Sequence, residues 1–191
     1  MYDDVKVDMD DSSHFLKTLV LPVLQEHCQE FQGRDIGVVE GSESKWHKHL
    51  DSIAGIDAYQ YTRYWMRGIA SRIQYGVDFK TFTIRTRRPT ENKTELEKRL
   101  FSLQHKEAGL FYPYWTVQAF IDKTEATLLS VGVAKTEELY TYVNVSEING
   151  RLFKRIKAGS GGQEFLYVDW YEYKETGNYF YEYMPGVESE T

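Results

Sequence analysis

Residues 54–76 read AGIDAYQYTRYWMRGIASRIQYG and contain two largely apolar runs joined by an arginine-rich turn. Asp57 lies on the first run, and Arg72 and Gln74 close the second at strand spacing. Residues rich in Ile, Tyr and alternating polar positions favour strands, and a turn between two such runs predicts neighbouring strands. Asp57 and Gln74 are then expected close together, either as ligands of a metal ion or as part of a hydrogen-bonded surface without chemistry.

The sequence before this stretch predicts a helix. Apolar residues recur every three or four positions over residues 15–31, which is the spacing of one helical face, and Gly33 ends the pattern. Pro22 lies inside it and should kink the helix or restart it. Residues 35–41 are expected to contain a short strand, and residues 42–50 a short helix.

The sequence after it predicts a third strand, a second helix and a hairpin. Residues 80–87 alternate polar and apolar side chains, as a strand with one buried face does. Thr94 and Glu97 have the spacing of a capping box that opens a helix. Residues 114–122 and 126–134 read as two strands joined by a tight turn.

Residues 151–191 are expected to form a β-rich extension of the same domain, because tyrosines alternate along residues 165–173 and 179–184 as in an aromatic hairpin. Residues 12–150 would form the core, and residues 1–11 an acidic arm. The order of helices and strands predicts an α/β or α+β fold with a mixed central sheet flanked by helices.

Bulk composition favours one soluble domain in the cytoplasm. A chain of 191 residues with 41% apolar residues is long enough to bury a core. No apolar run reaches the roughly 18 residues that a membrane span needs. The acidic start of the chain differs from the basic start of a signal peptide. The single cysteine, Cys28, forms no internal disulfide, which favours a reducing compartment.

The charge is unevenly distributed. The net charge is −6, yet residues 63–106 contain eleven Lys or Arg and four acids, a local charge of +7 that leaves −13 elsewhere. A basic face on an acidic body attracts phosphates. We therefore expect nucleic-acid binding by the arginines of the two strand ends, which are Arg72, Arg85, Arg87 and Arg88.

The order of one helix, three strands, a helix and a further strand over about residues 12–122 resembles the core of the PD-(D/E)XK nuclease superfamily, whose fold is restriction-endonuclease-like. The segments GIDAYQ and GIASRIQYG resemble its motif region, in which an aspartate on one strand precedes Glu-x-Lys or Gln-x-Lys on the next. Asp57 would be the motif aspartate and Gln74 the glutamine. Gly76 stands where the motif has lysine, and Lys80 would supply a migrated ammonium group.

The resemblance implies a Mg²⁺- or Mn²⁺-dependent endonuclease acting on DNA. Asp57 and Gln74 would hold the metal, with Glu26 of the first helix as a third oxygen donor, because divalent cations of this kind prefer oxygen ligands. Asp57, Gln74 and Lys80 would then have catalytic roles in phosphodiester hydrolysis.

Two other functions are compatible with the same residues. The first is a catalytically inactive protein on this scaffold that binds and inhibits a nucleic-acid-processing partner, as a small acidic protein encoded by a phage or mobile element would. The second is a self-associating structural module in which the tyrosine-rich tail forms a homodimer interface.

Overall fold

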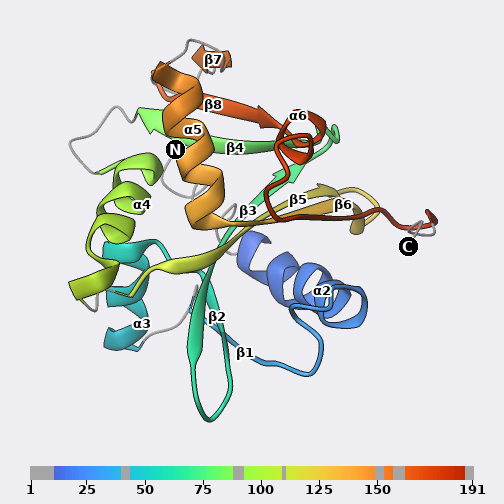
Figure 1. The fold of residues 1–191 in the computed structure, drawn as a ribbon. Coiled ribbons are helices and arrows are strands. Elements are labelled where there is room, and N and C mark those ends of the chain that lie inside the picture. The colour runs from blue at the N-terminus through green and yellow to red at the C-terminus, as the bar shows by residue number, and fades with distance from the viewer. Residues whose placement is uncertain are drawn as a thin grey trace.

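The computed structural model describes residues 11–39, 44–87, 93–108, 111–148, 153–156 and 162–187. Two sheets and the helices around them form a mixed α/β fold, as the sequence predicts (Figure 1). The arm predicted for residues 1–11 lies almost wholly outside the described residues. No described helix is long and apolar enough to cross a membrane.

The N-terminal helical segment covers one face of the larger sheet. It continues through a π-helical turn, η1 (Leu16–Val20), into α2 (Leu21–His27). Pro22 lies in the first turn of α2. Proline has no N–H to donate, and the hydrogen-bond pattern changes here from π-helical to α-helical while the backbone stays helical. Leu16, Val20 and Leu24 are fully buried against the sheet.

The larger sheet has six strands in the order β1-β2-β3-β5-β6-β9. Its first four strands in the chain are β1 (Asp35–Val38), β2 (Ala58–Tyr61), β3 (Met66–Tyr75) and β5 (Pro113–Asp122), with β1–β2 and β2–β3 antiparallel and β3–β5 parallel. It is completed by β6 (Thr127–Lys135) and β9 (Phe180–Tyr183), both added antiparallel. The sheet is therefore mixed, with the parallel pair at its centre.

The connection from β3 to its parallel neighbour β5 passes through a strand and a helix on the other face of the sheet. These are β4 (Thr81–Arg87) and α4 (Glu95–Gln104), and a short turn η3 (Lys106–Ala108) follows. The capping box is formed: the Thr94 hydroxyl accepts from Glu97 N–H, and Glu97 accepts from Thr94 N–H at 2.7 Å. The predicted start of α4 is confirmed.

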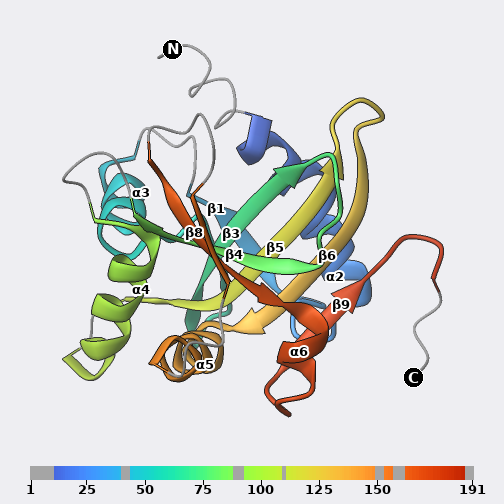
Figure 2. The same ribbon diagram turned by 90° about the horizontal axis from the view of Figure 1, so that it is seen from above.

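The smaller sheet has three strands in the order β4-β8-β7 and crosses over the larger one (Figure 2). Its other members are β8 (Glu164–Asp169) and β7 (Phe153–Ile156), both paired antiparallel. α5 (Thr136–Ile148) and α6 (Trp170–Lys174) lie beside the two sheets, and their apolar side chains share a core with β4 and β8. This core includes Phe82, Trp170 and Tyr173.

The predicted aromatic hairpin of the tail is wrong. β8 pairs with β4, β9 pairs with β6, and α6 separates them, so the two tyrosine-rich segments belong to different sheets. Asp169 accepts from the N–H groups of Tyr171 and Glu172 and so starts a helix where alternation predicted a continuing strand. Burial of Trp170 and Tyr173 in the shared core favours this helix.

The strand predicted to contain Asp57, over residues 52–61, is shorter than expected and begins after this residue. α3 (Lys45–His49) continues into a wider helical turn, η2 (Leu50–Ala54), and β2 starts only at Ala58. Gly55, at φ +59°, ends the helical segment and donates its N–H to Asp51. Glycine commonly adopts the left-handed conformation directly after a helix. Here Gly55 redirects the chain, so that Asp57 directly precedes β2.

Candidate functional site

A charged cluster lies where β2 and β3 meet the first turn of α4. We define it as Asp57, Arg72, Glu95, Arg99 and Tyr140, contributed by the residue that precedes β2, by β3, by α4 and by α5. It faces the side of the larger sheet that is opposite to α2. The structure thus confirms that Asp57 lies beside β3, and it adds three partners from distant segments.

Asp57 lies just before β2 and hydrogen-bonds to β3 through both its backbone and its side chain. Its backbone pairs with Ile69, and its carboxylate accepts from the N–H of Ser71 at 2.5 Å and from the Ser71 hydroxyl at 3.2 Å. Because β2 has not yet begun at this point, the Asp57 side chain, rather than a β2 backbone carbonyl, accepts from the N–H of Ser71 on β3. Burial raises the pKa of Asp57 to about 6, and nearby Arg99 offsets part of that rise.

Glu95 is held by several groups of the cluster. It forms an ion pair with Arg72 and accepts from the Tyr140 hydroxyl at 3.3 Å. Burial alone would raise its pKa, but Arg72 and Arg99 outweigh burial, so the pKa of Glu95 is lowered and it stays ionised. Arg99, only 4% exposed, donates to the carbonyl of Ala54. The cluster therefore neutralises its own charges.

Gln74 belongs to a different network. Its side-chain oxygen accepts from the Thr83 hydroxyl and from the Gln118 amide, both at 3.1 Å, and the Gln118 oxygen accepts from Thr83 N–H at 3.2 Å. These bonds join the larger sheet to β4. Asp57 lies opposite Ala70, so Gln74 is four residues farther along β3, about 13 Å at the usual rise per residue. One ion does not bridge that distance, so the structure does not bring this predicted pair of ligands together.

Glu26 and Lys80 also lie away from Asp57. Glu26 is on α2, on the other face of the larger sheet, with its side chain 74% exposed beside His27. Lys80 lies past the far end of β3, where it pairs with Asp78 at 3.1 Å and Glu182 at 2.9 Å. Lys80 is thus a structural link between the β3–β4 connection and β9, and the geometry does not support the predicted role in water activation.

The residues that are present do not fit a divalent cation. Across the described parts of the chain, no three His, Cys, Asp or Glu side chains gather at one point. The oxygens of Asp57, Glu95 and Gln74 already accept from protein donors, and two guanidinium groups occupy the space beside the carboxylates. Magnesium needs several uncommitted oxygen ligands. We derive no chemistry through a metal from this arrangement.

The predicted phosphate-binding arginines do not form a common surface. Arg72 forms an ion pair with Glu95, and the guanidinium groups of Arg72 and Arg85 lie 5.6 and 5.5 Å from the centroid of the Phe165 ring. Arg87 is exposed at the end of β4. Arg88 lies outside the described residues. Among these four, Arg87 alone is both described and exposed.

Sequence reasoning missed the feature that protrudes most clearly, the β2–β3 hairpin at the bottom of Figure 1. Thr62 and Trp65 close its turn through a backbone hydrogen bond of 2.9 Å. Tyr64 at the tip is 77% exposed and Tyr61 is 40% exposed. We call this the hairpin surface; it comprises Arg34, Tyr61, Arg63, Tyr64, Trp65, Arg67 and Tyr114.

Arginines and aromatic rings alternate along the hairpin surface. Arg34 lies 5.3 Å and Arg67 lies 4.6 Å from the centroid of Trp65, and Arg67 lies 4.2 Å from the centroid of Tyr114. At the tip, Arg63 covers the ring of Tyr64 at 4.5 Å. Stacking of this kind holds a guanidinium by its face and leaves its N–H edge available to a ligand.

The β2–β3 hairpin itself contains no acidic residue. Residues 58–77 include three arginines and no acid, in a chain that has 29 acids. The nearest acid in the register of the sheet is Asp35 of β1, which pairs with Tyr61 of β2. The sequence QYTRYWMR, in which arginines and aromatic residues interleave, could have indicated this surface. It could not have indicated that Arg34 and Tyr114, from other segments, lie beside these residues.

Comparison of the chain with protein-family models, with curated proteins and with solved structures finds no match. Function must therefore be argued from the geometry of the chain itself.

Proposed function

We propose that this protein binds nucleic acid through the hairpin surface and does so without metal-dependent cleavage. The observation that carries the proposal is the series Arg34, Trp65, Arg67 and Tyr114, in which cations and rings alternate. Guanidinium edges bind phosphate oxygens, and exposed rings stack on bases. The proposal keeps the nucleic-acid ligand expected from the sequence and moves it to other arginines.

The charge of the rest of the molecule makes this contact local. With a net charge of −6, most of the surface repels a polyanion, so attraction depends on the few arginines of the hairpin. Binding should weaken steeply as salt increases, because each phosphate contact releases counterions.

The test compares two charge reversals of exposed arginines by fluorescence anisotropy with labelled DNA. Arg63→Glu is at the hairpin tip, and its matched control Arg87→Glu is at the end of β4. We expect Arg63→Glu to weaken binding about tenfold or more and to lower the salt slope by about one, while Arg87→Glu binds like the wild type. The opposite pattern would place the contact at the end of β4 and overturn the proposal.

A cleavage assay tests the second half of the proposal. We expect plasmid, single-stranded DNA and RNA to stay intact with Mg²⁺ or Mn²⁺. Metal-dependent cleavage that disappears in Asp57→Asn, but persists in the exposed control Asp35→Asn, would restore the nuclease hypothesis.

A further inference from the structure

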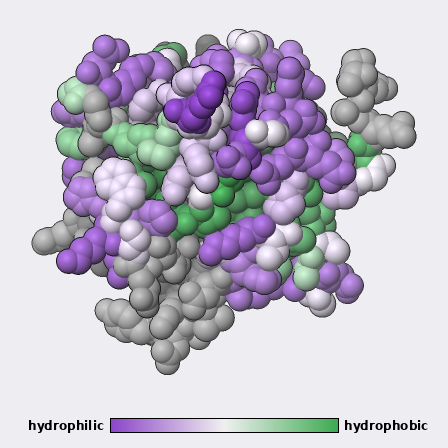
Figure 3. All heavy atoms as spheres, turned by 90° about the horizontal axis from the view of Figure 1, so that it is seen from below, coloured by the Kyte–Doolittle hydropathy of each residue, from purple (hydrophilic) through white to green (hydrophobic). Residues whose placement is uncertain are grey.

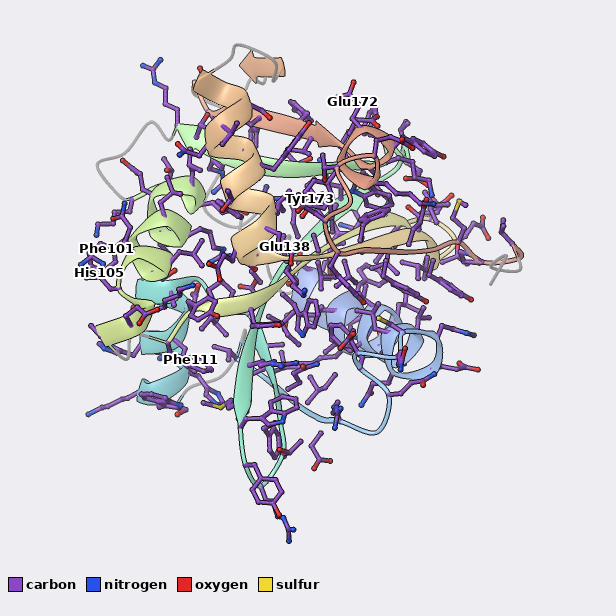
Figure 4. The ribbon with its side chains drawn as sticks, in the orientation of Figure 1. Phe101, His105, Phe111, Glu138, Glu172 and Tyr173 are labelled. Atoms are coloured by element: carbon purple, nitrogen blue, oxygen red, sulfur yellow. The ribbon has the colours of Figure 1, made fainter. Side chains whose placement is uncertain are left out.

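A groove opens directly beside the hairpin surface. Its volume is about 640 Å³, within the range of small-ligand sites, and it lies between the start of β5, the first turns of α5 and the segment before β9. It is lined by Tyr112 and Tyr114 at the start of β5, by Thr141 and Tyr142 of α5, and by Asn178. Figure 4 places Glu138 at the end of α5 that is nearest the hairpin.

Tyr114 belongs to both the groove and the hairpin surface. The guanidinium of Arg67 lies 4.2 Å from its ring, and the same residue lines the groove. A strand whose phosphate is bound by Arg67 would therefore have a neighbouring base at the groove entrance. The view from below, the side on which the hairpin protrudes, shows hydrophobic side chains at the centre of this face with hydrophilic ones around them (Figure 3).

The charges around the groove cancel within the protein. Lys135 pairs with Glu138 at 2.9 Å, and Lys106 pairs with Glu137 at 2.6 Å. The second oxygen of Glu138 accepts from Tyr179 N–H at 2.7 Å. A self-neutralised rim offers no net attraction to a phosphate, so the groove suits an uncharged planar group.

Two polar side chains in the groove are uncommitted. Neither the Asn178 amide nor the Thr141 hydroxyl bonds to any other described residue. An amide and a hydroxyl between tyrosine rings match the edge of a nucleobase, which presents both donors and acceptors, while the rings match its faces. The chemistry of the groove thus complements the chemistry of the hairpin.

We propose that the groove binds one unpaired nucleobase of a single strand whose phosphates are held by the hairpin arginines. This inference rests on the proposed function and specifies its ligand. A base inside a duplex cannot enter the groove without being flipped out, which costs unpairing and unstacking. The protein should therefore bind single strands more tightly than duplexes of the same sequence.

The experiment fills the groove without touching the hairpin. Thr141 is exposed on α5, and Thr141→Trp places an indole in the groove; the matched control Thr124→Trp is in the exposed β5–β6 turn. The probes are a labelled thymidine oligonucleotide and a labelled duplex. We expect Thr141→Trp to weaken single-strand binding about tenfold, the loss of one stacked base, and to leave duplex binding unchanged. Thr124→Trp should change neither.

A second readout uses the wild-type chain, so it does not depend on the folding of a variant. An oligonucleotide that carries 2-aminopurine should lose fluorescence on binding, because the base stacks on tyrosine. Wild-type affinity of Thr141→Trp for the single strand, or an unchanged 2-aminopurine signal, would refute the groove and leave the hairpin proposal standing. Absence of binding by the wild type to every nucleic-acid probe would refute the proposed function itself.

Discussion

The buried carboxyl of Asp57 should make this protein less stable as the pH rises. Its pKa is about 6 in the folded chain, against an ordinary value of 3.8. Between these pH values the folded chain keeps a proton that the unfolded chain has released, so the free energy of unfolding falls with rising pH. The stabilising contribution is complete below about pH 4 and is lost above about pH 6.

The expected loss is about 3 kcal/mol, since a tenfold change in proton affinity corresponds to about 1.4 kcal/mol. Asp57→Asn removes this titration and keeps an oxygen that can accept from the N–H of Ser71. The difference in unfolding free energy, variant minus wild type, should therefore rise by about 3 kcal/mol between pH 4 and pH 7.5.

The assay is urea unfolding of both proteins, followed by circular dichroism at several pH values. Asp35→Asn, an exposed site on β1, reports the effect of removing one negative charge. A difference between Asp57→Asn and the wild type that stays constant across this pH range would show that the surroundings of the Asp57 carboxyl do not raise its pKa.

Three further substitutions test the packing of the site by urea unfolding. Glu95→Gln leaves the partly buried Arg72 without its counter-charge and should cost about 1–3 kcal/mol, whereas an unchanged stability would show that the pair is solvated. Gln74→Leu removes an acceptor shared by two donors and should cost about 1–3 kcal/mol; an unchanged stability would contradict the network. Gly132→Ala places a Cβ 2.5 Å from the buried ring of Trp170 and should cost about 1–3 kcal/mol, with a neutral result indicating room in the core.

The site was only partly predictable from the sequence. Two apolar runs around a turn were enough to place Asp57 beside β3, because hairpin strands are neighbours in the chain. The register of the two strands was not predictable from the sequence. A shift of a few residues decides whether Gln74 lies next to Asp57 or about 13 Å away from it. Glu95 and Arg99 are close to each other in the sequence but far from Asp57. No local sequence pattern therefore indicated that they lie beside Asp57.

Local order followed from the sequence itself. The capping box of Thr94, the start of α2 around Pro22 and the alternation along β4 depend on interactions among residues a few positions apart, so the sequence determined them. The tertiary structure alone decided that β3 pairs in parallel with β5, that the tyrosine-rich tail divides between two sheets, and that Arg67 stacks on Tyr114. These choices depend on which distant apolar faces bury each other best, and that free energy belongs to the whole packed chain rather than to any one segment.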